Sequence, residues 1–260
     1  LFARALTKPL HILAYAATHL FAEHAMETLP LKRTDEIGIL ARCFDRLRRE
    51  IKSQMDVLHN KQRELVHLAT HDGLTGLPNR MLFMQKLEAA IEEATRRQEG
   101  LAVLFVDLDR FKQINDQFGH SIGDKVLAAV AKRLKKVLCT ADVAARLGGD
   151  EFIVLIEGPR SAEAAPGIAS RIMGALNEEL VIDGQSMTVG ASIGISQFPE
   201  DSATVEELLL HADAAMYAAK AGGRCGYLRY QDVLAARKRE REQEQANEGA
   251  TEGREAEPTA

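Results

Sequence analysis

Two aspartates stand at the end of the most apolar run in the chain. Residues 101–106 are six apolar residues in a row, which is typical of a strand buried on both faces, and Asp107 and Asp109 follow them. Carboxylates at a strand end, with a free backbone carbonyl nearby, suit a hard cation such as Mg²⁺. A helix starting near Arg110 would present unpaired N–H groups to a phosphate. The simpler alternative is that Asp109 caps this helix and Asp107 is merely exposed.

A second pair of carboxylates follows two glycines. Gly148 and Gly149 permit a tight turn and a close approach of the backbone to a ligand, and Asp150 and Glu151 would project from that turn. If this hairpin lies beside the first strand, Asp150 meets Asp107 around a common cation. Carboxylates that face triphosphate oxygens make electrostatic sense with a metal between them. The turn alone is an ordinary hairpin signal, but together the two pairs indicate nucleotidyl transfer.

Strands and helices alternate in the part of the chain that must position these groups. The predicted strands cover residues 101–106, 142–147, 152–156, 187–197 and 227–230. The predicted helices cover residues 81–97, 111–118, 122–138, 162–180 and 205–221. This alternation indicates an α+β or α/β fold with a central sheet covered by helices. Residues 231–260 are charged and poor in apolar residues, so a short helical extension should give way to a disordered tail.

Composition and charge limit the classes of partner. The 260 residues are 46% hydrophobic and 27% charged, as in ordinary globular proteins, and no apolar run reaches the roughly 18 residues of a membrane-spanning helix. The net charge of −5 argues against nucleic acid as a partner, because nucleic-acid binders usually carry a basic surplus. The three cysteines have no metal-ligand spacing, and so sparse and odd a number suits a reducing compartment.

A heptad pattern runs from Ile37 to Leu68. Ten positions alternate in steps of three and four, and eight of them are apolar: Ile37, Leu40, Phe44, Leu47, Ile51, Gln54, Leu58, Lys61, Leu65 and Leu68. A period of 3.5 residues favours a left-handed coiled coil, in which Gln54 and Lys61 would set the register and weaken the seam. The alternative is a long helix that packs on its own domain.

Residues 1–57 resemble a HAMP signalling module. The resemblance rests on Pro9 at the start of the first of two heptad helices and on an Asp-Glu-Ile-Gly step that begins at Asp35; Asp35 or Thr34 would cap the second helix. In that family the module follows a transmembrane helix, and this sequence begins with Leu1 instead of Met. We therefore expect the cytoplasmic portion of an inner-membrane-anchored bacterial protein, with a sensor and a transmembrane segment upstream. A plain dimerisation helix pair is the alternative.

Residues 71–230 resemble the GGDEF domains, which are diguanylate cyclases. The family signature Gly-Gly-Asp-Glu-Phe lies at residues 148–152. Further motifs of the family occur in its order and spacing, at residues 72–80, 107–112, 115–124, 192–194 and 212–224. The family fold is similar to the palm of nucleotide cyclases and polymerases, so the resemblance implies an α+β domain whose central sheet is flanked by helices.

The two resemblances together divide the chain into four parts. We expect a HAMP-like signalling module at residues 1–57 and a coiled-coil linker at residues 58–70. The cyclase domain should occupy residues 71–230, and the charged tail residues 231–260.

The GGDEF resemblance implies a metal site and a base. Asp107, the backbone carbonyl of Leu108 and Asp150 would hold two Mg²⁺ ions for each GTP, with Mn²⁺ as an alternative. Glu151 would act as the general base, or at least orient the attacking 3′-hydroxyl. Asp150 and Glu151 are therefore the expected catalytic pair.

The resemblance also implies a nucleotide site. Asn115 and Asp124 would hydrogen-bond guanine, because an aspartate can accept from the N1 and N2 donors of the base. The expected phosphate contacts come from the helix start at Phe111 and from Lys112, Lys220 and Arg224. A few well-placed cations would allow a net-acidic protein to bind GTP.

The implied activity requires two copies of the chain. Each protomer of a homodimer would hold one GTP, and the two would condense into cyclic di-GMP and two pyrophosphates under control of the upstream sensor, transmitted through the HAMP-like and coiled-coil helices. Two alternatives remain: a degenerate GGDEF domain that binds GTP or cyclic di-GMP as a regulatory module, and a purely structural dimeric relay. The intact acidic and basic site residues argue against the regulatory module.

Three positions need separate interpretation. The family's product-inhibition site is Arg-x-x-Asp, and here Cys139 replaces the arginine although Asp142 is kept, so we expect weak or absent product inhibition. Cys225 stands where the family usually has Asn, with an expected effect on the loop that holds Arg224. Asp72 follows a histidine as in metal phosphohydrolases, but without partner histidines it should form the turn that leaves the coiled coil.

Overall fold

A computed structural model describes residues 2–18, 29–158, 161–223 and 225–255. The chain divides into two compact units, Leu1–His67 and Leu68–Ala260. None of the helices in the described ranges is long and apolar enough to cross a membrane.

The first unit holds a small apolar cluster between two helices. Helix α1 covers Phe2–Thr18, and α3 begins at Glu36 and continues to Thr70 in the second unit. Leu13 of α1 packs in this cluster with Ile37 and Ala41 of α3. Beyond the cluster, leucines of the heptad series are exposed, among them Leu47, Leu58 and Leu65.

The start of α3 is capped by one of the two expected residues. Asp35 Oδ1 accepts a hydrogen bond from the backbone N–H of Gly38 at 3.1 Å. This bond satisfies one of the N–H groups that the first turn of a helix leaves without a partner.

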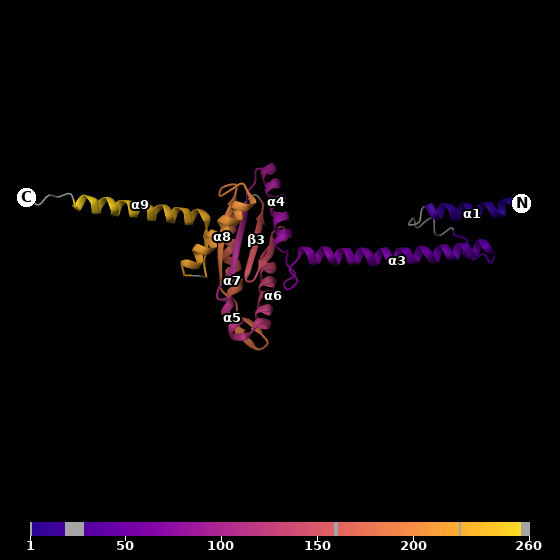
Figure 1. The fold of residues 1–260 in the computed structure, drawn as a ribbon, viewed down its shortest axis with the longest axis horizontal. Coiled ribbons are helices and arrows are strands. Elements are labelled where there is room, and N and C mark those ends of the chain that lie inside the picture. Colours follow the sequence, from indigo (N-terminus) through magenta and orange to yellow (C-terminus); the bar gives the residue numbers. More distant parts are fainter. Residues whose placement is uncertain (1, 19–28, 159–160, 224, 256–260) are drawn as a thin grey trace, which may run out of the picture. The chain divides into compact units, whose positions relative to one another are not determined.

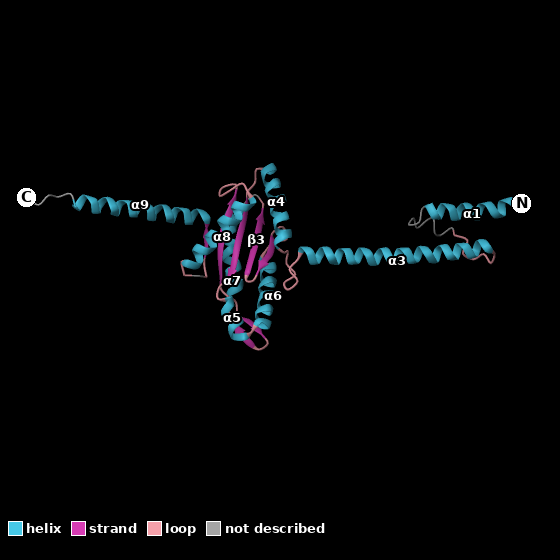
Figure 2. Ribbon diagram, in the orientation of Figure 1, coloured by secondary structure: helices cyan, strands magenta, loops and turns pink. Residues whose placement is uncertain are grey.

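The second unit is built on a mixed five-stranded sheet in the order β2-β3-β1-β6-β7 (Figure 2). The strands are β1 (Leu101–Leu108), β2 (Val143–Gly148), β3 (Glu151–Glu157), β6 (Ala191–Phe198) and β7 (Tyr227–Arg229). Neighbouring strands are antiparallel except β6 and β7, which are parallel. All eight residues of β1 are buried, because helices cover both faces of this central strand.

Two pairs of helices cover the sheet, one pair on each face (Figure 1). The pair α4 (Arg80–Arg97) and α8 (Val205–Ala221) packs on the face that carries Phe105. The pair α6 (His120–Val137) and α7 (Ser161–Asn177) packs on the face that carries Val106. The predicted α+β class, with a central sheet flanked by helices, is confirmed.

One glycine sets how closely α8 approaches the sheet. A Cβ atom on Gly194 of β6 would lie 1.9 Å from the carbonyl oxygen of Ala212 and 2.2 Å from the amide nitrogen of Met216. The helix backbone therefore rests directly on the strand, which no other residue type would permit without a shift. This contact fixes the height of α8 and of the side chains that it carries toward β1.

A hairpin that sequence patterns missed follows α7. The helix predicted over residues 162–180 ends at Asn177, and β4 (Leu180–Ile182) then pairs with β5 (Gln185–Met187). Asp183 and Gly184 between these strands have φ values of 50° and 79°. Two successive residues with positive φ form the tight hairpin turn that Asp-Gly favours, so this dipeptide was the available signal.

The remaining helices flank these elements. Helix α5 (Phe111–Phe118) follows β1 as predicted. Helix α9 (Tyr230–Glu255) continues much farther than the short extension expected before a disordered tail. Lys238 and Glu242 form an ion pair at helical spacing along it, at 4.0 Å, and residues of this type favour helix even without packing partners.

Candidate active site

The carboxylates of the two motifs meet at one end of the sheet. Asp107 of β1 is the register partner of Glu151 of β3. Side chains of antiparallel partners point to the same face of a sheet, here the face covered by α4 and α8. The backbone N–H of Leu108 also donates to the carbonyl of Asp150 at 3.3 Å. The signature hairpin thus lies beside the first strand, and it brings Asp150 near Asp107 as predicted.

Helix α8 adds a cation to this cluster. Lys220, in its last turn, places Nζ 2.7 Å from Asp107 Oδ1. Burial raises the pKa of Asp107, the hydrogen bond from Lys220 opposes that rise, and the charge of Asp150 adds to it. The ammonium group therefore stabilises a carboxylate that burial alone would tend to protonate.

Glu151 has the properties of a proton acceptor. Burial raises the pKa of its carboxyl, and the charges of Asp107, Asp150 and Asp213 raise it further, whereas Lys220 lowers it. A carboxyl whose pKa is moved upward toward neutral pH is a better general base than an ordinary exposed glutamate. Asp213, on α8, was not among the predicted site residues.

Asp109 holds neighbouring segments together. The simpler interpretation, in which Asp109 caps the next helix and Asp107 is merely exposed, is wrong. Asp109 Oδ1 accepts from the hydroxyl of Ser192 at 2.9 Å and its Oδ2 from the N–H of Cys225 at 3.0 Å. The N-cap of α5 is Arg110, and no side chain caps this helix start, so Asp109 does not cap α5. Asp107 is only 6% exposed. The bond to Cys225 ties the loop after α8 to the residue that follows β1. Arg224, predicted to contact phosphate, lies outside the described residues.

The turn into α5 leaves backbone amides available. Arg110 precedes the helix in the left-handed region, with φ 60° and ψ 22°, and no side chain caps the first turn. Phe111 is buried in the core, whereas Lys112 is exposed beside it. Free N–H groups at a helix start attract anions, so this predicted phosphate contact has a suitable local geometry.

The two predicted guanine-binding residues are held near each other by a glycine. A Cβ atom on Gly123 of α6 would lie only 1.9 Å from Oδ1 of Asn115 on α5. The Asn115 amide therefore lies against the backbone of Gly123, and the next residue is the exposed Asp124. This packing explains the spacing of the motif, which the sequence alone presents only as a pattern.

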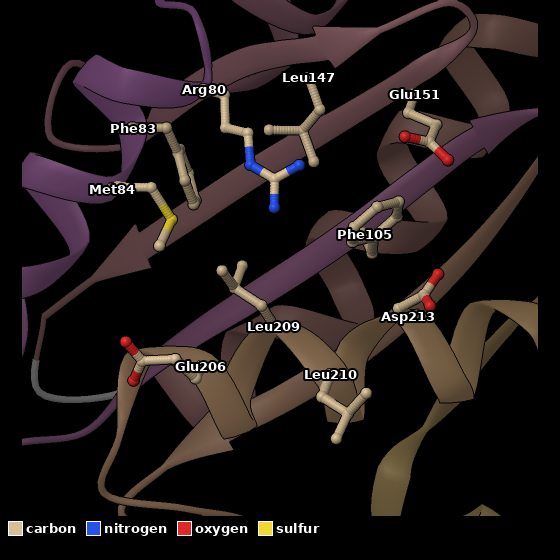
Figure 3. Close-up of a pocket in the computed structure, with 10 residues that line it drawn as sticks. All are labelled: Arg80, Phe83, Met84, Phe105, Leu147, Glu151, Glu206, Leu209, Leu210 and Asp213. Carbon is tan, nitrogen blue, oxygen red and sulfur yellow. The ribbon is translucent and has the colours of Figure 1, made fainter.

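A groove of about 440 Å³ begins at Glu151 and runs between α4 and α8. Figure 3 shows Glu151 and Asp213 at one end of it, and the guanidinium of Arg80 pointing between Leu147 and Leu209. Phe105 forms part of its floor. The general-base candidate is therefore open to a reacting group from outside the domain.

A positioning residue that sequence patterns missed stands two residues before the signature glycines. Arg146 donates from Nε and Nη2 to the carbonyl of Gly149, at 3.1 and 2.8 Å. In the sequence, the only indication of this role was the position of Arg146 just before the Gly-Gly turn. These bonds hold the backbone from which Asp150 and Glu151 project.

The donors at this end of the sheet fit a magnesium ion that is shared with a phosphate ligand. Within the described ranges, no group of three or more His, Cys, Asp or Glu side chains is arranged to hold a metal by itself. Asp107 and Asp150 nevertheless offer two hard carboxylate donors. Magnesium is commonly bound by one or two carboxylates plus substrate phosphates, so the short protein donor set agrees with that mode.

Comparison with known proteins identifies the second unit. Residues 69–225 match the sequence family described as "Diguanylate cyclase, GGDEF domain". Diguanylate cyclase TpbB of Pseudomonas aeruginosa is 40% identical over 223 residues, which cover 84% of this chain and 50% of TpbB. The bifunctional diguanylate cyclase/cyclic di-GMP phosphodiesterase MucR of that organism is 45% identical over 183 residues, 70% of this chain and 27% of MucR. The chain thus spans half or less of these relatives.

Solved structures agree with this assignment. The crystal structure of the GGDEF domain of Pseudomonas aeruginosa TpbB has a TM-score of 0.59 and 42% identity, over 60% of this chain and 97% of that one. The coiled coil and GGDEF domain of DgcB from Caulobacter crescentus, in complex with c-di-GMP, has a TM-score of 0.62 and 28% identity, over 71% of this chain and 97% of that one.

Proposed function

The chain belongs to the GGDEF diguanylate cyclase family, and we propose that it condenses two molecules of GTP into cyclic di-GMP. The 3′-hydroxyl of each GTP attacks the α-phosphate of the other, so two P–O bonds form and two pyrophosphates leave. The observation that carries the proposal is the meeting of Asp107, Asp150 and Glu151 at one sheet end, with Lys220 among them.

In this proposal two carboxylates bind metal and a third accepts a proton. Asp107, Asp150 and the carbonyl of Leu108 hold the divalent cations, Mg²⁺ or Mn²⁺, which supply Lewis-acid stabilisation of charge on the triphosphate when bound. Glu151 takes the proton of the 3′-hydroxyl, and its raised pKa and its position on the open groove support that role.

The nucleotide is held at both ends. Asn115 and Asp124 bind the guanine edge, and the N–H groups at the start of α5 by Phe111 bind phosphate. The cations Lys112, Lys220 and Arg224 complete the phosphate site. Catalysis is then mostly positioning and electrostatic stabilisation, because the protein forms no covalent bond to the substrate.

The proposed catalyst is a homodimer, since each protomer holds one GTP and the two half-sites must face each other. The seam of α3 supports this arrangement: Leu47, Leu58 and Leu65 are 60%, 65% and 67% exposed, which is unusual for large apolar side chains at heptad spacing. Joining two domains through such a stalk raises the effective concentration of one half-site near the other.

We also propose that residues 1–57 are a HAMP-like module and residues 58–70 a coiled-coil linker to a cyclase domain at residues 71–230. The cap of α3 by Asp35 supports the module. In this proposal a sensor with a transmembrane segment lies upstream, the chain is the cytoplasmic portion of an inner-membrane-anchored bacterial protein, and a signal changes how the half-sites meet. Fusions to a rigid coiled coil in several registers test the coupling, because equal rates in all registers would contradict it.

The activity is tested by incubating the chain with GTP and Mg²⁺ and identifying the product by mass spectrometry. We expect cyclic di-GMP and pyrophosphate from the wild type and none from Asp150→Ala. Glu163→Ala, at an exposed position on α7, is the matched control and should keep the activity. Binding of GTP without turnover would instead support a regulatory nucleotide-binding module, and neither binding nor turnover a structural relay.

A further inference from the structure

Lys220 and Asp107 share a direct ion pair at the end of β1. The 2.7 Å between Nζ and Oδ1 is at the short end of the range for charge-assisted hydrogen bonds, so no water separates the two groups. The side chain of Asp107 is 9% exposed and that of Lys220 is 28% exposed. The contact is therefore largely shielded from solvent, where an ion pair is screened much less than on the surface.

Several negative groups interact with the carboxylates that Lys220 stabilises. Asp150, Asp109 and Glu151 interact electrostatically with Asp107, and Asp213 adds its charge at Glu151. Lys220 opposes that negative charge at both Asp107 and Glu151. Lys220 is thus a counter-cation to at least two carboxylates of this cluster, Asp107 and Glu151.

One oxygen of Asp107 cannot bind both a magnesium ion and the Lys220 ammonium group without repulsion between the two cations. A magnesium ion bonds a carboxylate oxygen at about 2.0–2.1 Å, and an ammonium nitrogen at 2.7 Å from that oxygen would bring two positive charges close together. Metal and ammonium therefore compete for Asp107. Lys220 needs another anionic partner before the metal can bind there without opposition, and the triphosphate of GTP provides one.

We infer that Lys220 acts as a placeholder for the metal, so that its ammonium group moves from Asp107 to the nucleotide phosphates when metal and nucleotide bind together. The inference rests on the proposed function for the identity of the nucleotide, and it adds a regulation of that site. When metal binds to the protein alone, the Lys220–Asp107 ion pair breaks and Lys220 gains no new partner. When metal binds together with a triphosphate, Lys220 exchanges its contact with Asp107 for one with the phosphates. Metal and nucleotide are consequently cooperative, each raising the affinity for the other by the same factor.

The test measures metal affinity without nucleotide. We would titrate the full chain with Mn²⁺ at pH 8 and follow free Mn²⁺ by electron paramagnetic resonance, for the wild type and for Lys220→Met. Mn²⁺ is the probe because it accepts the same oxygen ligands as Mg²⁺ and is directly observable. We expect the Mn²⁺ dissociation constant of Lys220→Met to be at least about tenfold lower than that of the wild type. In the variant, Mn²⁺ no longer has to break the shielded Lys220–Asp107 ion pair.

A second titration measures the coupling. With a GTP analogue that cannot be cleaved at the α-phosphate, the wild type should bind Mn²⁺ much more tightly than without it. The factor by which the analogue tightens Mn²⁺ binding should be at least about tenfold smaller in Lys220→Met, since the variant has no ion pair to exchange.

Two further variants make the result unambiguous. Lys125→Met removes the same charge from an exposed ion pair with Asp183 and should leave nucleotide-free Mn²⁺ binding unchanged. Lys220→Gln replaces Lys220→Met if the methionine variant does not fold. An unchanged Mn²⁺ dissociation constant in a folded Lys220 variant, or an equal gain in Lys125→Met, would overturn the inference.

This outcome is separable from that of the proposed function. A wild type that forms no cyclic di-GMP but shows the expected gain in Lys220→Met would remove the cyclase proposal and leave the placeholder. An active wild type with unchanged Mn²⁺ binding in Lys220→Met would support the cyclase proposal and overturn the inference about Lys220.

Discussion

Arg146 donates hydrogen bonds from Nη1 to both carboxylate oxygens of Asp72, each at 3.1 Å, across 74 positions of sequence. Asp72 lies in the turn after α3, where its carboxylate also accepts from the N–H and hydroxyl of Thr75. Because Arg146 binds the carbonyl of Gly149 as well, one side chain links the turn after α3 to the signature turn.

The Asp72–Arg146 pair should contribute to both stability and activity. The side chain of Arg146 is only 11% exposed, so Arg146→Ala removes the cationic partner of Asp72 in a shielded place, and we expect a loss of about 2–3 kcal/mol in the free energy of unfolding. Urea unfolding measures this loss. Turnover of GTP should fall as well, because the turn that carries Asp150 and Glu151 loses its support.

The exposed pair Arg229–Asp232 provides the control for this prediction. Its side chains are 49% and 44% exposed, and Arg229→Ala should change the free energy of unfolding by less than about 1 kcal/mol. Equal effects of the two substitutions would contradict a special role for Arg146.

The pair also predicts an acid dependence. Burial raises the pKa of Asp72, but the hydrogen bonds from Thr75 and Arg146 outweigh it and lower the pKa below its ordinary value of 3.8. The stabilisation is then fully present above that ordinary value and is lost as pH falls through the lowered pKa. Asp72→Asn should flatten the fall of unfolding free energy in this acid range.

Gly194 should tolerate no side chain. In Gly194→Ala the new methyl group meets the backbone of α8, which must move away from β6 and carry Lys220 and Asp213 with it. We expect a loss of at least about 2–3 kcal/mol in the free energy of unfolding and a fall in cyclase activity. Thermal unfolding and a product assay measure the two effects.

Gly174→Ala on α7 is the matched control. A Cβ at Gly174 would meet no heavy atom within 4 Å beyond its chain neighbours and the backbone of its own helix turn, and alanine in a helix is favoured over glycine by up to about 1 kcal/mol. This variant should be equally or more stable, and a Gly194→Ala protein of wild-type stability would refute the close packing.

The raised pKa of Glu151 predicts a pH-dependent rate. Burial and the charges of Asp107 and Asp150 favour the protonated form, so the rate should rise with pH as Glu151 ionises and level off above its pKa. Glu151→Gln should reduce turnover by roughly 10²–10⁴-fold and remove this limb of the pH profile. A profile of the same shape with Glu151→Gln would exclude Glu151 as the base.

The raised pKa of Glu151 should also make folding stability fall with rising pH, whereas the rate should rise with pH. A carboxyl whose pKa is higher in the folded state binds more protons there, so folding stability decreases as pH rises from the ordinary value of 4.5 through the raised pKa. Glu151→Gln should therefore increase the free energy of unfolding at neutral pH. Glu163→Gln, at an exposed position on α7, should not.

Restoring an arginine at position 139 should introduce product inhibition. Asp142 Oδ2 accepts from the N–H of Cys139 at 2.9 Å, so the two positions already share one turn, and Cys139 is exposed. Cys139→Arg should supply the bidentate donor that a thiol lacks, and its progress curve should slow as product accumulates. The wild type should show no early stall that product hydrolysis relieves; such a stall would contradict our interpretation of Cys139.

The seam of α3 should control dimerisation. In Leu58→Asp/Leu65→Asp two exposed leucines of the heptad become charged, and we expect the dimer dissociation constant to rise at least about 100-fold, because each leucine buried in a dimer contributes about 1.5–3 kcal/mol. Sedimentation analysis measures this change, and cyclase activity should fall with it.

Ser53→Asp/Asn60→Asp adds the same charge at exposed positions of α3 outside the heptad series. This control should dimerise like the wild type. If both double variants dissociate equally, charge and not the seam is responsible.

The amino-acid sequence determined which chemistry is available and roughly where each element lies. The apolar run before Asp107 predicted a buried strand, and the Gly-Gly turn predicted the hairpin that carries Asp150 and Glu151; both are present. These features are local, since backbone periodicity and turn preference depend on residues a few positions apart.

Only the tertiary structure decided how distant residues are paired. That Lys220 rests on Asp107, that Arg146 joins Asp72 to the signature turn, and that Asp109 binds Cys225 depend on strand register and on the approach of α8 at Gly194. Sequence spacing carries no information on such distances, because contacts between residues far apart along the chain form only when the whole sheet and its helices pack together.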